Sequence, residues 1–432
     1  MSKRTIDELE ENINKRLKQM EDNYKQMEVN NKSINDTFLS ILTYEQIFKL
    51  FDECNFNIIK YIISNKNGFD INMIIDGKTL LFNACDKNNL VVIQLLLSNT
   101  ATDVNKATTD IFFGITPLLI ACQHGHEEVV RLLLAHPATN VNQAKTDDGT
   151  TPLYIACQNG HEGVVRLLLA HAATKVNQAT TDVGSTPLFM ACQEGHEGVV
   201  RLLLAHAATD VNQARTNDGT APLLMACVQG HEGVVRLLLE NATTDVNQAL
   251  TDDGSTPLFV ACLMGWEEVV ELLLENAATK VNQATTDDGR TPLWAACENC
   301  HKGVVRMLLG NAATDVNQTT FYGTTPLFIA CSKGGSLTDE NQRRRHYEGV
   351  VRLLLEDART TRPTEEYYEA AWTLYVAALK NLRRTRNARF RGLIRATIAF
   401  NRKRLATAQR IYAPGGAGFT AAAASFAAAV ER

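Results

Sequence analysis

The sequence predicts a mainly α-helical solenoid of stacked helix–turn–helix units, and three recurring segments support this fold. A T-P-L-x-x-A-C pattern returns about every 35 residues, a G-H-E-x-V-V-R-L-L-L segment follows each copy, and a D-V-N-Q-A-T-like segment comes next. Self-similarity at a period of roughly 20–50 residues is typical of solenoids, in which each unit packs only on its neighbours. The prolines of the pattern are Pro117, Pro152, Pro187, Pro222, Pro257, Pro292 and Pro326. Such a chain is expected to act through a surface rather than a pocket.

Each element of one unit follows from its residues, as in the copy that begins near Asp147. A turn at Gly149 precedes Thr151, which caps a helix whose first position is Pro152, where the missing N–H costs nothing. Gly160 ends this short helix, and Glu162 begins the second. The second helix carries a broad apolar stripe that predicts its buried face: Val164, Val165, Leu167, Leu168 and Leu169.

After the second helix the chain is expected to extend outward into a hairpin that leads to the next turn.

The repeated motifs together resemble the ankyrin repeat, strongly over residues 77–358 and weakly over 40–76; they are T-P-L-x-x-A, G-H, V-V-x-L-L, D-V-N and D-G. The resemblance implies helix pairs with projecting β-hairpins and G-H histidines that bond the backbone near the hairpins. Two departures are a period longer than the usual 33 and the loss of the histidine after T-P-L, which becomes Leu119, Tyr154, Phe189, Leu224, Phe259, Trp294 and Phe328.

The chain is expected to have five parts. Residues 1–36 are a polar helical lead, either a short coiled coil or a solvated or disordered segment, and 40–76 are a degenerate capping repeat. Residues 77–358 hold about eight repeats, the last with an inserted loop at 334–346. Residues 359–412 are a basic helical region and 413–432 a Gly/Ala-rich tail.

Charge is unevenly distributed along the chain. Residues 370–432 carry a formal charge of +11, while the remaining residues carry −16, for a net −5. Three interpretations of the basic part, Arg383–Arg410, stay open. It is a helix pair that caps the array, a nuclear-localisation or nucleic-acid patch, or an amphipathic segment on an anionic membrane.

The cysteines and histidines do not predict chemistry. Stacked helices lie about 8–10 Å apart, whereas a disulfide needs Cα atoms within about 7 Å. The C-x-x-C formed by Cys297 and Cys300 has no second pair, and successive G-H histidines are too far apart to share one metal ion. We therefore expect no enzyme activity, metal, cofactor or small-molecule substrate. Eight cysteines share one slot and are interpreted as core fillers: Cys85, Cys122, Cys157, Cys192, Cys227, Cys262, Cys297 and Cys331.

Partner-binding residues are sought where otherwise similar repeats differ. These positions follow either the repeat cysteine or the hairpin glycine. The residues that follow the hairpin glycine are Ile115, Thr150, Ser185, Thr220, Ser255 and Arg290. Apolar residues interrupt the mostly polar set, and exposed apolar clusters with tryptophan often mark interfaces, although drift between duplicated copies would also explain them. The candidate residues are Gln158, Asn159, Gln193, Glu194, Val228, Gln229, Leu263, Met264, Trp266, Glu298, Asn299 and Arg290.

These patterns predict an intracellular, non-catalytic scaffold or adaptor that binds an unknown protein partner on a concave surface. No secretory signal or membrane span is expected, which favours the cytoplasm and allows the nucleus. The alternative is a regulatory or nucleic-acid-associated factor. Its Arg-rich tail would bind nucleic acid or membrane while the repeats recruit a protein.

Overall fold

The computed structural model describes residues 62, 70–109, 114–335, 343–357 and 359–360, and this part of the chain is mainly α-helical. It contains sixteen helices, α5 to α20, and no strand; one isolated bridge joins Ile75 and Lys78. The chain forms two compact units, Met1–Thr244 and Asp245–Arg432. The expected helix–turn–helix architecture is confirmed.

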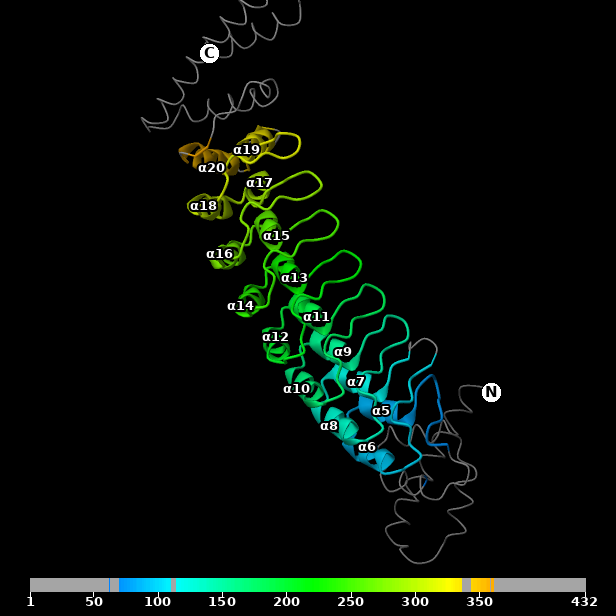
Figure 1. The fold of residues 1–432 in the computed structure, drawn as a ribbon. Helices are drawn as coiled ribbons and strands as arrows, with labels where there is room; N and C mark the ends of the chain where they lie inside the picture. The colour runs from blue at the N-terminus through cyan, green and yellow to red at the C-terminus, as the bar shows by residue number, and fades with distance from the viewer. Residues whose placement is uncertain (1–61, 63–69, 110–113, 336–342, 358, 361–432) are drawn as a thin grey trace, which may run out of the picture. The chain divides into compact units, whose positions relative to one another are not determined.

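Each repeat contributes a first and a second helix, and within each unit these form two rows with the long loops projecting from the first (Figure 1). In the first unit the first helices are α5 (Leu80–Asp86), α7 (Pro117–His124), α9 (Pro152–Gln158), α11 (Pro187–Glu194) and α13 (Pro222–Gln229). The second helices are α6 (Leu90–Leu97), α8 (Glu127–Ala135), α10 (Glu162–Ala170), α12 (Glu197–Leu204) and α14 (Glu232–Glu240).

The second unit repeats this arrangement. Its first helices are α15 (Pro257–Met264), α17 (Pro292–Glu298) and α19 (Pro326–Gly335), and its second helices are α16 (Glu267–Glu275), α18 (Lys302–Gly310) and α20 (Arg343–Glu356).

The core is a repeated layer of small and branched apolar side chains. In the repeat of α9 and α10, Leu153, Ala156 and Cys157 of the first helix and Val165 and Leu168 of the second are buried. A small Ala–Cys pair lets neighbouring first helices approach closely, and β-branched and leucine side chains fill the space beside it. The predicted core role of the repeat cysteines is confirmed, since all eight are buried and none of them forms a disulfide.

Helix limits are set by local hydrogen bonds that the sequence pattern encodes. The Thr151 hydroxyl accepts from the backbone N–H of Tyr154 at 3.1 Å, so it caps α9 just before Pro152. At the far end of each second helix, a threonine hydroxyl donates to a carbonyl that the helix leaves unpaired, as Thr174 does to Leu168 at 2.6 Å.

An asparagine side chain joins each repeat to the next. Asn177 Nδ2 donates to the carbonyl of Ala208 at 2.6 Å, and its Oδ1 accepts from the backbone N–H of Asp210 at 3.0 Å. Asn142 makes the same pair of bonds to Ala173 and Lys175. This amide clamp is made by the asparagine of D-V-N, which explains why that residue recurs.

The projecting loops are turns rather than the expected β-hairpins. Lys145 N–H donates to the Thr150 carbonyl at 2.9 Å, and Thr181 N–H donates to the Asp148 carbonyl of the preceding loop at 2.8 Å. These single bonds alternate between a loop's own turn and the neighbouring loop, so no strand ladder forms in the described residues.

Helix extends into both ends of the segment that was expected to be an inserted loop in the last repeat. Helix α19 continues to Gly335 and α20 starts at Arg343, so helix covers both ends of the segment 334–346 that was expected to be a loop. Arginine is a good helix former, and three arginines precede the apolar part of α20. The expectations for 1–36 and 413–432 lie outside the described residues, as do those for most of 40–76 and 359–412.

One missing cap gives a stability prediction. Helix α13 has Ala221 at its N-cap, with φ −83° and ψ 161° and no side-chain hydrogen bond, whereas Thr186 caps α11 at nearly the same angles. Ala221→Thr should therefore raise the free energy of unfolding by about 1 kcal/mol, and Thr186→Ala should lower it by a similar amount. Urea denaturation followed by circular dichroism measures both, and a destabilised Ala221→Thr variant would contradict the cap assignment.

Candidate partner surface

The residues that follow each repeat cysteine lie at the C-terminal ends of the first helices. In the five pairs that contain predicted site residues, the first side chain is half-buried and the second is exposed. The half-buried positions are Gln158, Gln193, Val228, Leu263 and Glu298, and the exposed ones are Asn159, Glu194, Gln229, Met264 and Asn299. The exposed positions are therefore available to a partner within each unit.

The positions after the loop glycine are different, and treating them as surface was wrong. Thr150, Ser185, Thr220 and Ser255 are all buried. The Ser255 hydroxyl donates to Asp253 Oδ2 at 2.8 Å, and its N–H donates to Asp253 Oδ1 at 2.8 Å. These small polar residues close the turn beneath the loop, so their variation is limited to side chains that fit there.

Arg290 occupies the same position as these residues but turns into a network within the second unit. Its guanidinium lies 5.5 Å from the ring centre of Trp294 and 5.9 Å from that of Phe259. Its Nε forms an ion pair with Asp288 Oδ2 at 2.6 Å without hydrogen-bond alignment, and Nη1 lies 3.9 Å from Glu298. A partner that reaches Arg290 must compete with these contacts.

Similar cation–π contacts are made by other aromatic residues in the position after T-P-L. Arg215 lies over the buried ring of Phe189 at 5.3 Å, and Lys78 lies over Phe82 at 5.4 Å. The aromatic side chain thus packs against a basic side chain of its own loop, as Phe82 does, or of the next loop, as Phe189 does, through a cation–π contact.

The most exposed apolar residues at a predicted site are in the second unit. Met264, the last residue of α15, is 46% exposed, and Trp266, at the N-cap of α16, is 41% exposed. Leu263 beside them is half-buried. Val228 belongs to the first unit, where it is half-buried at the end of α13.

A second exposed apolar feature was missed. Phe321 and Tyr322, at the tip of the loop before α19, are 70% and 75% exposed. Most other loops carry Asp just before the glycine, although Phe112 and Phe113 precede Gly114, so the change from D-D-G to F-Y-G was visible in the sequence.

The G-H histidines connect successive repeats. His196 Nε2 donates to the Gln158 carbonyl at the end of α9, 3.0 Å away, and His301 Nε2 makes the equivalent bond to Leu263 at 3.0 Å. The acceptors are helix ends, so the expectation of a bond near the hairpins was wrong. Gly160 has φ +73°, and a Cβ there would meet the His196 ring at 2.8 Å, which explains the G of G-H. Among the described residues, no group of three or more His, Cys, Asp or Glu could hold a metal ion.

Tyr347 takes over the histidine's role in the last described repeat. Tyr347 stands just before Glu348, where most other repeats have the histidine of G-H-E. Its hydroxyl donates to the Glu298 carbonyl at 2.6 Å. Tyrosine and histidine both place a donor at this carbonyl, which is why the repeat tolerates the exchange.

The repeat thiols are held in their neutral form. Burial raises the pKa of the Cys157 and Cys192 thiols well above the ordinary range. Cys300 is half-buried with φ +63° where most other repeats have glycine, and burial raises its pKa to about 11. A nucleophilic cysteine needs a lowered pKa, so these thiols are poorly suited to that role.

Comparison with known families agrees with this geometry. The family model described as ankyrin repeats (3 copies) matches residues 50–144, 102–179, 172–249, 243–320 and 279–366. The chain belongs to the ankyrin-repeat family. No curated protein matches the chain.

Ankyrin repeats indicate a protein–protein interaction scaffold, and proteins of this family are generally non-enzymatic. Over the part of the chain that the structure describes, none of the helices is both long and apolar enough to cross a membrane.

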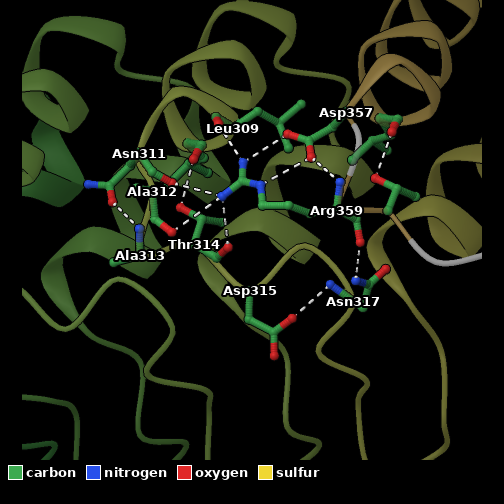
Figure 2. A network of polar contacts seen from close by, with 12 residues as sticks. Leu309, Asn311, Ala312, Ala313, Thr314, Asp315, Asn317, Asp357 and Arg359 are labelled. Atoms are coloured by element: carbon green, nitrogen blue, oxygen red, sulfur yellow. Dashed lines mark hydrogen bonds and ion pairs between the residues drawn. The ribbon is translucent and has the colours of Figure 1, made fainter.

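The last described ankyrin repeat ends in an arginine network (Figure 2). Arg359 occupies the position of the alanine whose carbonyl accepts the asparagine clamp, and Asn317 Nδ2 still donates to its carbonyl at 2.7 Å. The guanidinium reaches back past the end of α18, and Asp357 holds it with a 2.8 Å bond to Nη2. It donates to the carbonyls of Leu309, Asn311, Ala312 and Thr314. The arginine therefore satisfies backbone acceptors that a small residue would leave to water.

The Arg359–Asp357 pair gives a pH prediction. Hydrogen bonds from Arg359 hold the pKa of the Asp357 carboxyl below its ordinary value. A lowered pKa in the folded state stabilises the fold above the unfolded pKa, near pH 4, and this contribution is lost as pH falls through the folded value. Asp357→Asn should therefore cost about 1 kcal/mol at pH 7, because the pair is partly solvated, and much less near pH 2–3.

Urea denaturation followed by tryptophan fluorescence measures this difference, because all three tryptophans lie between residues 245 and 432. A cost that is the same at both pH values would show that the carboxylate does not stabilise the network.

Proposed function

We propose that this ankyrin-repeat protein is a non-catalytic scaffold or adaptor that binds a protein partner through the ends of its first helices and its loop tips. The observation that carries the proposal is that Met264 and Trp266 are both exposed and apolar. At the position of Met264 other repeats carry polar side chains, and at that of Trp266 most carry the G-H histidine that bonds the preceding repeat.

The mechanism is rigid presentation. Asparagine clamps and histidine bonds fix each loop and helix end on its neighbour, as Asn282 does with the Ala313 carbonyl at 2.7 Å. A partner then binds side chains whose backbone is already ordered, so association costs little conformational entropy.

Tryptophan and neighbouring apolar side chains supply most of the energy in many interfaces, whereas polar rim residues contribute less. Leu263, Met264 and Trp266 are therefore proposed as the main contact in the second unit, and Phe321 and Tyr322 as an additional one at the loop tip. The other candidates are proposed as further contacts within each unit taken by itself: Gln158, Asn159, Gln193, Glu194, Val228 and Gln229 in the first unit, and Glu298, Asn299 and Arg290 in the second.

The alternative is a regulatory or nucleic-acid-associated factor, favoured by the +11 charge of residues 370–432. In that case the whole protein would bind DNA or anionic vesicles with a steep loss of affinity as salt increases. We propose that the protein acts in the cytoplasm or the nucleus.

The scaffold proposal predicts the effect of replacing the apolar contact. Alanine at Leu263, Met264 and Trp266 should reduce recovery of bound proteins in affinity purification with the whole chain. A hot-spot loss of about 2 kcal/mol corresponds to about thirtyfold weaker binding.

A matched control is Val91→Ala, which removes an exposed apolar side chain of α6 outside the proposed surface. Thermal denaturation should show both proteins folded. The same set of captured proteins for the triple variant and the wild type would contradict the proposed site.

A further inference from the structure

We infer that the surface formed by Met264, Trp266 and the outer face of α16 binds the chain's own basic segment, Arg383–Arg410. This inference rests on the proposed function, because it names an occupant for the same apolar contact. The occupant is identified by the chemistry of the surface and by what residues 361–432 contain.

The first observation is the charge of α16. Glu267, Glu268, Glu271 and Glu275 are all exposed, and this helix has no basic residue. Residues three and four apart lie on one helix face, so the four carboxylates form an acidic strip that begins beside Trp266.

The second observation concerns the residue that other second helices carry at the position of Glu271. Arg236 of α14 pairs with Glu232 at 2.6 Å, and Arg131 of α8 pairs with Glu128 at 3.2 Å. Glu271 stands where those helices have arginine, so α16 gains repulsion where they have an ion pair. Glu275, in the last turn, also opposes the helix dipole.

Basic residues on the neighbouring α18 do not neutralise the strip. Lys302 lies over Gly349 of α20, where a Cβ would meet its Cδ at 3.2 Å. Among the described residues, no ion pair joins Lys302 or Arg306 to the four glutamates. Glu267 lies over Gly303 at the first turn of α18, and the other three glutamates of the strip are exposed.

The occupant should therefore combine several basic residues with apolar ones. Arg383–Arg410 contains ten Lys or Arg residues and no acid, and apolar residues are interleaved with them: Phe390, Leu393, Ile394, Ile398, Phe400 and Leu405. The arginines match the strip, and the aromatic and aliphatic side chains match Met264 and Trp266.

The connection is long enough to permit this contact. Helix α16 lies two repeats before α20, a distance of about 20 Å at 8–10 Å per helix layer. Residues 361–382 separate the last described residue from Arg383, and a chain of that length spans up to about 70 Å. The segment can therefore reach the surface of its own chain.

Photo-crosslinking in the whole chain tests the inference. With p-benzoylphenylalanine at position 264, irradiation should join this position to a peptide from 383–410, in an adduct with the mass of one chain. Raising the salt from about 0.05 to about 0.5 M should reduce the yield several-fold, because exposed charges are then screened.

Glu268→Lys together with Glu271→Lys should reduce the yield about tenfold. The matched change on α14, Glu232→Lys together with Glu240→Lys, should leave it unchanged. Circular dichroism shows whether each variant is folded.

Crosslinks to another part of the chain, crosslinks only between two chains, or no crosslink in a folded protein would overturn the inference. A crosslink only to a co-purified protein would overturn it while leaving the scaffold function intact. Failure of the scaffold function is a separate result, namely unchanged protein capture by the Leu263, Met264 and Trp266 alanine variant.

Discussion

The structure depends on side-chain amides that bridge from one ankyrin repeat to the next. A clamp can use both ends of one asparagine, as that of Asn142 does with the Ala173 carbonyl at 2.7 Å and the Lys175 N–H at 2.8 Å. The clamp fixes where the second helix of the next repeat ends and where its loop begins. Apolar burial stabilises the stack, but burial is not directional, so these bonds define the spacing.

A stack held in this way separates residues that maintain the fold from residues free to vary. Histidine, tyrosine and asparagine donors occupy the contacts between repeats, while the last positions of the first helices face solvent. Exchanges at these exposed positions cost little stability. The second unit therefore carries large exposed apolar side chains, Met264 and Trp266 in one repeat and Phe321 and Tyr322 in another.

Much of the fold could be predicted because its signals are local. A threonine before proline defines a helix start, and eight cysteines at one spacing define a core slot. The missing strands could not be predicted, since loop bonds alternate between a turn and its neighbour. Burial of Ser255 depends on how its own loop closes, and the role of Tyr347 depends on the adjacent repeat. Arg359 lacks a counterpart elsewhere in the array, so its contacts with the α18 carbonyls were not evident from the period.

Hydrogen–deuterium exchange of an Asn177→Ala variant tests the nearest-neighbour clamp most directly. Loss of the bonds to Ala208 and Asp210 should accelerate exchange about tenfold in peptides that cover residues 204–212 of the next repeat. Peptides from α7 and α8 should be unaffected, as should all peptides in the control Arg166→Ala, which changes an exposed residue of α10. Unchanged exchange at 204–212, or equal acceleration along the whole array, would contradict the clamp.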